Sequence, residues 1–501
     1  MAIMKNIAVL LLLALSVLCT EETMAQPLPR STPEEQGISS TAILDFVKTV
    51  EGEIDALHSF MLLRHGKVVA EGWWYPYAAE RRHRLYSLST SFVSTAIGIA
   101  VADGELTLDD RVLDYFPDEA PTAPDRNLEA MRIRDLLMMS SGHQDDTLGK
   151  FFAGGDVSWV RTFLNLPVEH KPGTHFAYNT GATYMLAAIL QKTTGDHVVD
   201  YLEPRLFEPL GINGYHWQES PQGITVGGRG LRVKTEDIAR FGQLYLQKGV
   251  WDGERVLSEA WVEAATSRQT SNGSDPDSDW EQGYGYLFWR GRHGSYRTDG
   301  AFGQFCIVLP EQDAVLAITG GVRNSKAQDV LDLVWDHLLP AMKPEALPAA
   351  DQSYAVLTDK ISFLFLKPLR AASYSMRGPE LSDQIFEFDD NEQGVESMSF
   401  DFGRNSNAFI IHDDQGEHRI EVGHGTWLKG ESSYDNHGLE PIATSGGWTD
   451  ADTFMARVFF LEMPYSAKLE FDFSEGRVRF DFGYNVSFGQ IRRPQLISDF
   501  P

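Results

Sequence analysis

The apolar residues of this chain change their spacing near residue 350, and this change divides the sequence into two parts. Before it, apolar residues recur every three or four positions, as from Phe92 to Val101, which predicts helices. After it, apolar and charged residues alternate, as in Leu469 to Phe473 and Val478 to Phe482 on either side of Ser474-Glu475-Gly476. A period of two predicts strands with one apolar and one charged face. Because 501 residues exceed one ordinary core, two domains are expected.

A proline-rich and alanine-rich stretch separates the two parts. Pro340, Pro344 and Pro348 predict a linker at 341–352, between a first domain at 26–340 and a smaller all-β domain at 353–501, either a sandwich or a barrel. Strands of the second domain are also expected at Ile361 to Lys367, Gln384 to Phe388, Ser397 to Phe402, Ala408 to His412 and Thr453 to Glu462.

The first domain reads as strands, then helices, then strands and a closing helix. This order suits an α+β domain whose antiparallel sheet is completed by both ends of the domain, with a helical insertion between them. The expected elements are a helix from Ser39 or Ser40 to about Val50, a hairpin around His65-Gly66, the helix behind Ser87, mostly helix from Trp159 to Leu246 with Thr235 as the N-cap of its last helix, strands at Tyr284 to Arg290, Gln304 to Leu309 and Ala314 to Thr319, and a helix at Gln328 to Leu339.

Residues 1–25 resemble a cleavable signal peptide. Lys5 precedes an apolar run from Ile7 to Leu18, and Thr23-Met24-Ala25 offers small residues for cleavage before Gln26. Lipid attachment at Cys19 is not expected, because Leu18 stands where a small residue is needed. We therefore expect a periplasmic or secreted protein.

The net charge excludes several classes of partner. The chain carries 71 acidic and 43 basic side chains, a formal net charge of −28, which argues against binding to nucleic acid or to anionic lipid. No later segment is long and apolar enough to span a membrane. No glycine-rich phosphate loop appears, and His412, His418 and His424 lack the usual spacing of metal ligands, so neither a cofactor nor a metal is expected. The oligomeric state is not indicated.

The segment Arg84 to Ala100 contains the first candidate for chemistry. Small polar residues crowd its start and a predicted helix follows, which puts Ser87 at or near the first helical turn. Free backbone N–H groups and the positive end of the helix dipole favour a developing anion there. The same position also suits an ordinary helix cap.

Three stretches together resemble the serine β-lactamase and penicillin-binding-protein superfamily. They are Tyr86-Ser87-Leu88-Ser89-Thr90, Tyr178-Asn179-Thr180-Gly181 and Thr298-Asp299-Gly300-Ala301, and their order and spacing match the class C β-lactamase-like branch with its esterases and D-amino-acid peptidases. The resemblance covers roughly Pro33 to Leu339 and implies a β-lactamase-like sheet with a helical subdomain.

The resemblance also assigns roles. It implies that Ser87 is the nucleophile, that Tyr178 is the general base or acid, and that the N–H groups of Ser87 and Ala301 form an oxyanion hole. The substrate is then a small molecule or a peptidoglycan-like peptide. The residues expected to bind it are Thr180, Thr298, Asp299 and Gly300.

The sequence departs from the family pattern at its base. The family places a lysine three residues after the serine, where the two side chains share a helical face, but this chain has Thr90. No lysine lies between Lys67 and Lys150, so a shifted register does not restore the motif. Thr298 replaces the usual Lys or His of the third motif, and the nearest cation, Arg297, is expected on the opposite face of the strand. Thr90 is kept as the third candidate catalytic residue.

These observations leave two principal hypotheses. The first is an exported serine hydrolase that acts on ester, amide or D-amino-acid peptide bonds through an acyl-enzyme at Ser87, impaired by loss of the lysine. The second is a non-catalytic binding or regulatory protein with the same fold. A third, weaker alternative makes the β domain the functional part, as a carbohydrate or cell-wall binder.

Overall fold

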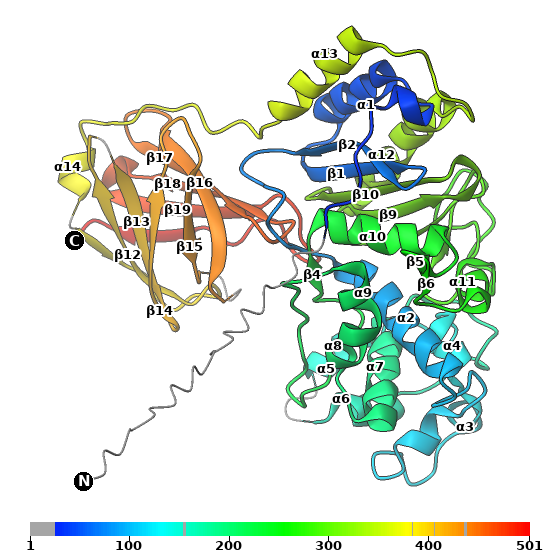
Figure 1. Ribbon diagram of the computed structural model, residues 1–501. Coiled ribbons are helices and arrows are strands. Elements are labelled where there is room, and N and C mark those ends of the chain that lie inside the picture. The colour runs from blue at the N-terminus through cyan, green and yellow to red at the C-terminus, as the bar shows by residue number, and fades with distance from the viewer. Residues whose placement is uncertain (1–25, 154–156, 383, 405, 435–437) are drawn as a thin grey trace, which may run out of the picture.

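The computed structural model describes residues 26–153, 157–382, 384–404, 406–434 and 438–501. The signal segment expected at 1–25 lies outside the described residues. Within the described part, no helix combines the length and the apolar character needed to cross a bilayer. The chain forms an α+β first domain and a C-terminal domain of strands (Figure 1), as the change in apolar spacing predicts.

A six-stranded antiparallel sheet forms the centre of the first domain. Its strand order is β2-β1-β10-β9-β8-β7, so strands from the start and the end of the domain lie side by side, as expected. Phe60 of β1 pairs with Ile318 of β10. The strands are β1 (Leu57–Arg64), β2 (Lys67–Trp73), β7 (Trp289–Arg290), β8 (Tyr296–Gly300), β9 (Gln304–Leu309) and β10 (Ala314–Gly320).

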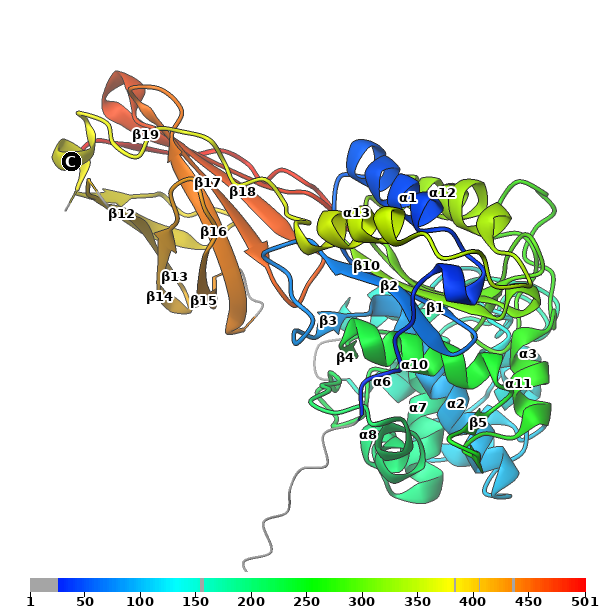
Figure 2. The same cartoon turned by 45° about the horizontal axis from the view of Figure 1, so that its top comes forward.

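Helices cover both faces of this sheet and bury a separate apolar core on each (Figure 2). One face carries α1 (Ser40–Glu53), α12 (Ala327–Leu333) and α13 (Asp351–Ser362), and the other carries α10 (Thr235–Leu246) with the helical subdomain behind it. That subdomain contains α2 (Ser89–Ala102), α3 (Arg126–Ala130), α4 (Ile133–Leu137), α5 (Leu148–Ala153), α6 (Trp159–Leu164), α7 (Thr180–Thr194), α8 (Val198–Leu202) and α9 (Glu208–Leu210), while α11 (Glu259–Thr266) packs nearby.

Local signals in the sequence fix several of these elements. The Ser39 hydroxyl caps α1 by accepting a hydrogen bond from the Ala42 N–H at 3.2 Å, and the apolar residues of the helix are buried at spacings of three and four. The expected hairpin turns at His65-Gly66 between β1 and β2. The N-cap of α10 is Lys234 and not the predicted Thr235, because the Asp237 carboxylate accepts from the Lys234 N–H.

Two predicted strands are wrong or shortened. Ile361 to Lys367 is not a strand, because α13 runs to Ser362 and docks on α1 by burying Leu357. The alternating Phe363 and Phe365 that suggested a strand are 69% and 51% exposed. The strand expected at Tyr284 to Arg290 is limited to β7.

The C-terminal domain consists of two antiparallel sheets around one apolar core. Phe471 pairs with Phe480, and Leu469 with Phe482, so the alternation in the sequence does place these apolar side chains inside. One sheet contains β11 (Ile385–Glu387), β12 (Val395–Phe402), β13 (Asn407–Asp413) and β14 (Gly416–Val422). The other contains β15 (Leu428–Ser432), β16 (Glu440–Trp448), β17 (Thr453–Phe460), β18 (Ser466–Asp472), β19 (Arg477–Tyr484) and β20 (Leu496–Asp499).

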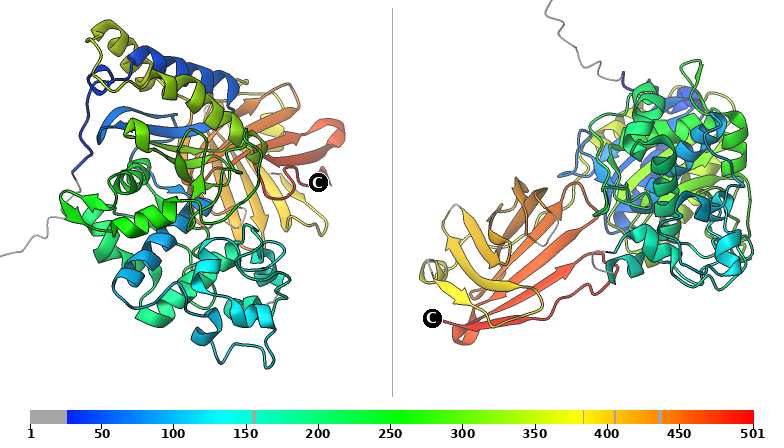
Figure 3. Two further views of the ribbon diagram at one scale, coloured as in Figure 1. Left: turned by 90° about the vertical axis from the view of Figure 1, so that its right-hand side faces the viewer. Right: turned by 90° about the horizontal axis from the view of Figure 1, so that it is seen from below.

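The C-terminal domain touches the first domain with one end of its larger sheet (Figure 3). The buried Arg232 of the first domain forms ion pairs with Glu440 at 2.6 Å and Glu462 at 3.2 Å. Beside this cluster the ring of Phe459 packs edge-on against Tyr77. These contacts make a buried interface of ion pairs and aromatic rings.

Candidate active site

Ser87 lies where a short turn runs into the buried helix α2. Residues Tyr86–Leu88 form a single 3₁₀ turn, and α2 begins at Ser89, so the placement expected from the sequence is confirmed. The segment is held by a hydrogen bond from the Leu85 N–H to the Leu231 carbonyl at 2.8 Å. Ser87 is half-buried, whereas most of α2 is buried. The hydroxyl at position 87 therefore stands at the accessible end of a rigid element.

Gly300, at the end of β8, brings the edge of the sheet against this turn. A Cβ at position 300 would lie 1.9 Å from the Leu85 carbonyl oxygen and 3.1 Å from the Leu88 nitrogen. Only a residue without a side chain permits that approach. The position after it, Ala301, is thereby set beside Ser87.

Two backbone N–H groups at this junction are open. Among the described residues, neither the Ser87 N–H nor the Ala301 N–H donates to another protein group, whereas the Phe302 N–H donates to Asn324 Oδ1 at 2.9 Å. Backbone donors that are fixed but unpaired are the elements of an oxyanion hole.

Tyr178 lies across the junction, directly before α7. Its ring stacks on Trp289 with centroids 5.6 Å apart and planes 6° from parallel. Its phenol lies near the hydroxyls of Ser87 and Thr90. Burial raises the pKa of Tyr178, the hydroxyls of Ser87 and Thr90 lower it, and the carboxylate of Asp299 raises it further. Three hydroxyl groups therefore share one site, and the phenol is held in its neutral form at neutral pH.

A pocket of about 300 Å³ opens beside these groups. It is lined by Ser87, Tyr178, Trp280, Trp289, Asp299, Gly300, Ala301, Phe305, Asn324 and Ala327. Its walls are mainly aromatic and backbone surfaces with a single carboxylate. Such a pocket has the shape and polarity of a site for a small organic molecule.

The only ionised pair at this pocket within the described chain is Arg297 with Asp299. Arg297 Nε donates to Asp299 Oδ2 at 2.9 Å, Nη1 donates to the Asp279 carbonyl at 2.8 Å, and the guanidinium lies 4.6 Å from the centroid of the Trp280 ring. Arg297 is fully buried beneath the pocket. Burial raises the pKa of Asp299, while Arg297 lowers it. The arginine balances the charge of Asp299 and donates no hydrogen bond to Tyr178, so it does not replace the missing lysine.

Two of the residues predicted to bind substrate lie outside the pocket lining. Thr298 is buried and donates to the Leu88 carbonyl at 3.3 Å. Thr180 is the first residue of α7, where Asp146 accepts from its N–H at 2.9 Å and from its hydroxyl at 2.8 Å. Asp299 and Gly300 do line the pocket.

Sequence reasoning missed the aromatic walls. Trp280 and Trp289 line the pocket, but nothing in a single sequence separates them from other tryptophans, because Trp289 is placed there by the pairing of β7 with β8 and Trp280 by the fold of a loop. The available signal was their closeness in sequence to the third motif. Asn324 was missed for the same reason.

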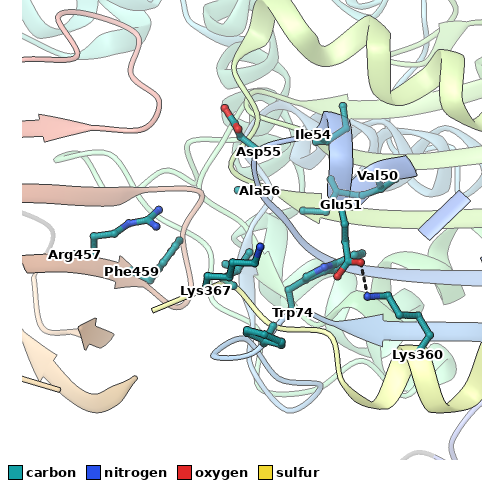
Figure 4. Close-up of a pocket in the computed structure, with 13 residues that line it drawn as sticks. Val50, Glu51, Ile54, Asp55, Ala56, Trp74, Lys360, Lys367, Arg457 and Phe459 are labelled. Carbon is teal, nitrogen blue, oxygen red and sulfur yellow. Dashed lines mark ion pairs between the residues drawn. The ribbon is translucent and has the colours of Figure 1, made fainter. Parts of the chain in front are cut away.

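A second, larger pocket lies between the domains and differs in its chemistry (Figure 4). It has a volume of about 470 Å³, and Trp74, Lys367 and Arg457 are among the residues that line it, together with the ion pair of Glu51 and Lys360. No serine, threonine, cysteine or tyrosine of the described chain lines it. The Ser87 pocket, which combines two hydroxyls with open backbone N–H groups, is the candidate active site.

The fold and the site define a class. An antiparallel sheet whose edge meets a serine at the start of a buried helix, opposite a tyrosine, is the arrangement of the serine β-lactamase and penicillin-binding-protein superfamily. The sequence model of the Beta-lactamase family matches residues 56–337, more than half of the chain. The chain belongs to this family.

Individual relatives are distant. A 6-aminohexanoate-dimer hydrolase of Paenarthrobacter ureafaciens is 26% identical over 309 residues, which cover 57% of this chain and 78% of that protein. Penicillin-binding protein 4 of Amycolatopsis lactamdurans is 28% identical over 300 residues, which cover 52% and 77%. Among solved structures, a β-lactamase-like protein of Bacteroides dorei DSM 17855 aligns with a TM-score of 0.51 at 16% identity, covering 60% of this chain and 99% of that one. This last likeness supports the fold alone.

Proposed function

We propose that this protein is a slow serine hydrolase that cleaves ester bonds of small molecules through an acyl-enzyme at Ser87. The observation that carries the proposal is that Ser87 and Tyr178 line the same pocket, near enough for the Ser87 hydroxyl to lower the pKa of Tyr178, beside two open backbone N–H groups. The hydrolase and penicillin-binding relatives support the reaction class. Amide and D-amino-acid peptide bonds, including peptidoglycan-like ones, are further substrates of the same proposed chemistry.

The proposed reaction has two steps. The Ser87 oxygen attacks the ester carbonyl and gives its proton to the ionised form of Tyr178, while the N–H groups of Ser87 and Ala301 bind the oxyanion. The C–O bond to the alcohol then breaks, and the alcohol leaves with that proton. Water attacks the acyl-enzyme in the same way, which releases the acid and restores Ser87.

The missing lysine decides which bonds are cleaved. A tyrosine with a pKa near 10 is ionised in about one molecule in a thousand at pH 7, and burial reduces that fraction here. Positioned general bases contribute roughly 10² to 10⁴ in rate, so a site without the lysine is slower by much of that factor than one that has it. An alcohol with a low pKa leaves readily even when this proton transfer is incomplete, whereas an amine leaves only after it is protonated. Activated esters are therefore the best substrates of such a site.

A second candidate function is binding without turnover. It is favoured by the raised pKa of Tyr178 and by the carboxylate neighbours that cause part of that shift. In this case the pocket recognises an ester, amide or peptide ligand and does not react with it.

Hydrolysis of a p-nitrophenyl ester separates the two candidates. We expect the wild-type protein to hydrolyse it slowly and the Ser87→Ala variant to show only the buffer rate. Thr90→Lys places an amine three residues after the serine and is expected to raise the rate by about 10² to 10⁴. Thr90→Met, of similar length but without a base, is the matched control. A wild-type rate equal to that of Ser87→Ala would leave binding as the function.

We further propose that the protein acts outside the cytoplasm. The apolar run from Ile7 to Leu18 and the small residues before Gln26 support export. N-terminal sequencing of the protein recovered from the periplasm or the medium is expected to start at Gln26. A protein that stays in the cytoplasm with Met1 intact would contradict export.

A further inference from the structure

Two connections of the C-terminal domain reach the first domain beside the candidate active site. One follows β17 and contains Pro464 and Tyr465, and the other follows β19 and begins at Asn485. The Asn485 side chain joins them, because its Nδ2 donates to the Gly321 carbonyl at 3.1 Å and to the Pro464 carbonyl at 3.0 Å. The domains approach so closely that a Cβ on Gly321 would lie 2.4 Å from the Pro464 oxygen. Both connections are therefore anchored at the end of β10.

From this anchor the C-terminal domain contacts the residue that precedes Ser87. The hydroxyls of Tyr86 and Tyr465 are 2.5 Å apart. The Tyr86 ring packs edge-on against Phe302, with centroids 5.5 Å apart, and Phe488 lies 5.6 Å from Tyr86 and 4.7 Å from Phe302. Val486 is buried in the same cluster. Rings from two domains thus enclose Tyr86 and Phe302.

Both enclosed residues have a strained backbone. Tyr86 has φ +50° and Phe302 has φ +69°, a left-handed conformation that bulky side chains rarely adopt. Such a conformation persists only where the surrounding structure enforces it. Tyr86 directly precedes the Ser87 N–H, and Phe302 directly follows the Ala301 N–H. The aromatic cluster therefore holds the two segments that carry the open N–H groups.

We infer that the C-terminal domain is a working part of the Ser87 site, in which Tyr465 is a positioning residue that holds Tyr86 and so orients the Ser87 and Ala301 N–H groups. The inference rests on the proposed function for its effect on rate, but its structural part is independent of any activity. It also assigns a task to the C-terminal domain, whose larger sheet meets the first domain at one end (Figure 3). Tyr465 lies in the connection that precedes β18 and Phe488 in the one that follows β19, and the Phe488 ring packs on Phe302.

The test compares Tyr465→Phe and Tyr465→Ala with wild type in the full chain. Tyr374→Phe, which removes a hydroxyl from another tyrosine of the same domain, is the matched control. Two readouts are taken: kcat and KM for the p-nitrophenyl ester, and amide hydrogen exchange of peptides containing Leu88 and Phe302. Removal of one oxyanion donor costs about 10² to 10³ in rate, and misplacement costs less. We expect kcat to fall about tenfold in Tyr465→Phe, with KM and the melting temperature little changed, and to fall further in Tyr465→Ala, which also lowers the melting temperature because it removes a packed ring.

Exchange separates this inference from the proposed function. Faster exchange at Leu88 and Phe302 in both Tyr465 variants, but not in Tyr374→Phe, supports positioning even if the wild-type protein hydrolyses nothing. In that case the proposed function fails and the inference stands. Unchanged exchange overturns the inference, whatever happens to the rate. A rise in KM with constant kcat also overturns it, because it would make Tyr465 part of the substrate-binding surface instead.

Discussion

At the scale of single residues, one substitution in the motif sets the chemistry of the site. Thr90 occupies the position of an amine and places a hydroxyl near Tyr178, and a hydroxyl is no base near neutral pH. Proton transfer then falls to Tyr178, whose surroundings favour the neutral phenol. The reactivity of Ser87 therefore depends on how often that phenol ionises.

The first prediction concerns pH. Because burial raises the pKa of Tyr178 above its ordinary value near 10, its ionised fraction keeps increasing through the alkaline range. The single-turnover rate of Ser87 acylation is expected to rise about tenfold per pH unit from 7 to 10 without a plateau. Tyr178→Phe should remove this dependence. A plateau near pH 7 in the wild-type protein would show that another group is the base.

The second prediction concerns Gly300. A methyl group there would overlap the Leu85 carbonyl oxygen, so Gly300→Ala must push β8 away from the turn that carries Ser87. We expect a loss of about 1–3 kcal/mol in unfolding free energy, typical of overpacking, together with loss of ester hydrolysis. Gly52→Ala in α1 is the control, because nothing lies within 4 Å of the added Cβ, and it should stabilise the helix by about 0.5–1 kcal/mol. Equal behaviour of the two variants would refute the close approach.

At the scale of elements, α13 is the helix that the sequence pattern does not predict, because a linker and then a strand are expected there. It follows the proline-rich stretch yet packs on α1 and β2, so it extends the helical layer of the first domain. Leu357 is 1% exposed in this contact, and Lys360 forms an ion pair with Glu51. The burial of Leu357 decides the position of the helix, since an ion pair that is open to solvent on one side contributes little.

The third prediction tests that docking. Leu357→Ala should lower the unfolding free energy of the protein by about 2–4 kcal/mol, because it removes a buried side chain and leaves a cavity. Val356→Ala is the neighbouring control on the same helix, where the side chain is 49% exposed, and it should change the stability by less than about 0.5 kcal/mol. Chemical denaturation measures both. Similar losses for the two variants would contradict the docking.

Patterns that act over a few residues could be predicted, and contacts between distant segments could not. The Ser39 cap, the turn at His65-Gly66 and the bounds of β9 follow from local residues, and three motifs in order indicated the family and the placement of Ser87. The ion pair of Arg297 with Asp299 is local, since residues two apart on a strand share a face, but the sequence does not show that this face lies beside the pocket. The contact of Tyr465 with Tyr86 spans 379 positions and has no local signal.

At the scale of the whole molecule, the first domain buries two histidines behind the aromatic contact through which the domains meet. His58 and His83 are buried side by side, with 3.0 Å between His58 Nδ1 and His83 Nε2, and His58 stacks on Tyr77, whose ring contacts Phe459 of the C-terminal domain. Burial lowers the pKa of His83 to about 4 and also lowers the pKa of His58. Both imidazoles are therefore neutral at pH 7, and a fall in pH favours the unfolded chain, in which the histidines can bind protons.

The fourth prediction follows from that sign. An unfolded histidine binds a proton near pH 6.5 and the folded His83 only near pH 4, so its contribution to stability is complete above pH 6.5 and is lost between 6.5 and 4. The lowered pKa of His83 alone should reduce the unfolding free energy by about 2 kcal/mol when the pH falls from 7.5 to 5. Urea unfolding at both pH values is expected to show a smaller drop in His83→Gln than in wild type. An equal drop in the two proteins would exclude His83 as a cause.

The central claim is that Ser87 reacts with acyl electrophiles in a site that has no lysine. Incubation of the full chain with a fluorophosphonate, followed by peptide mass spectrometry, tests it most directly. We predict one adduct, on the peptide that contains Ser87, which is absent in Ser87→Ala and forms much faster in Thr90→Lys. A wild-type protein that stays unmodified at Ser87 while Thr90→Lys is labelled would contradict the claim.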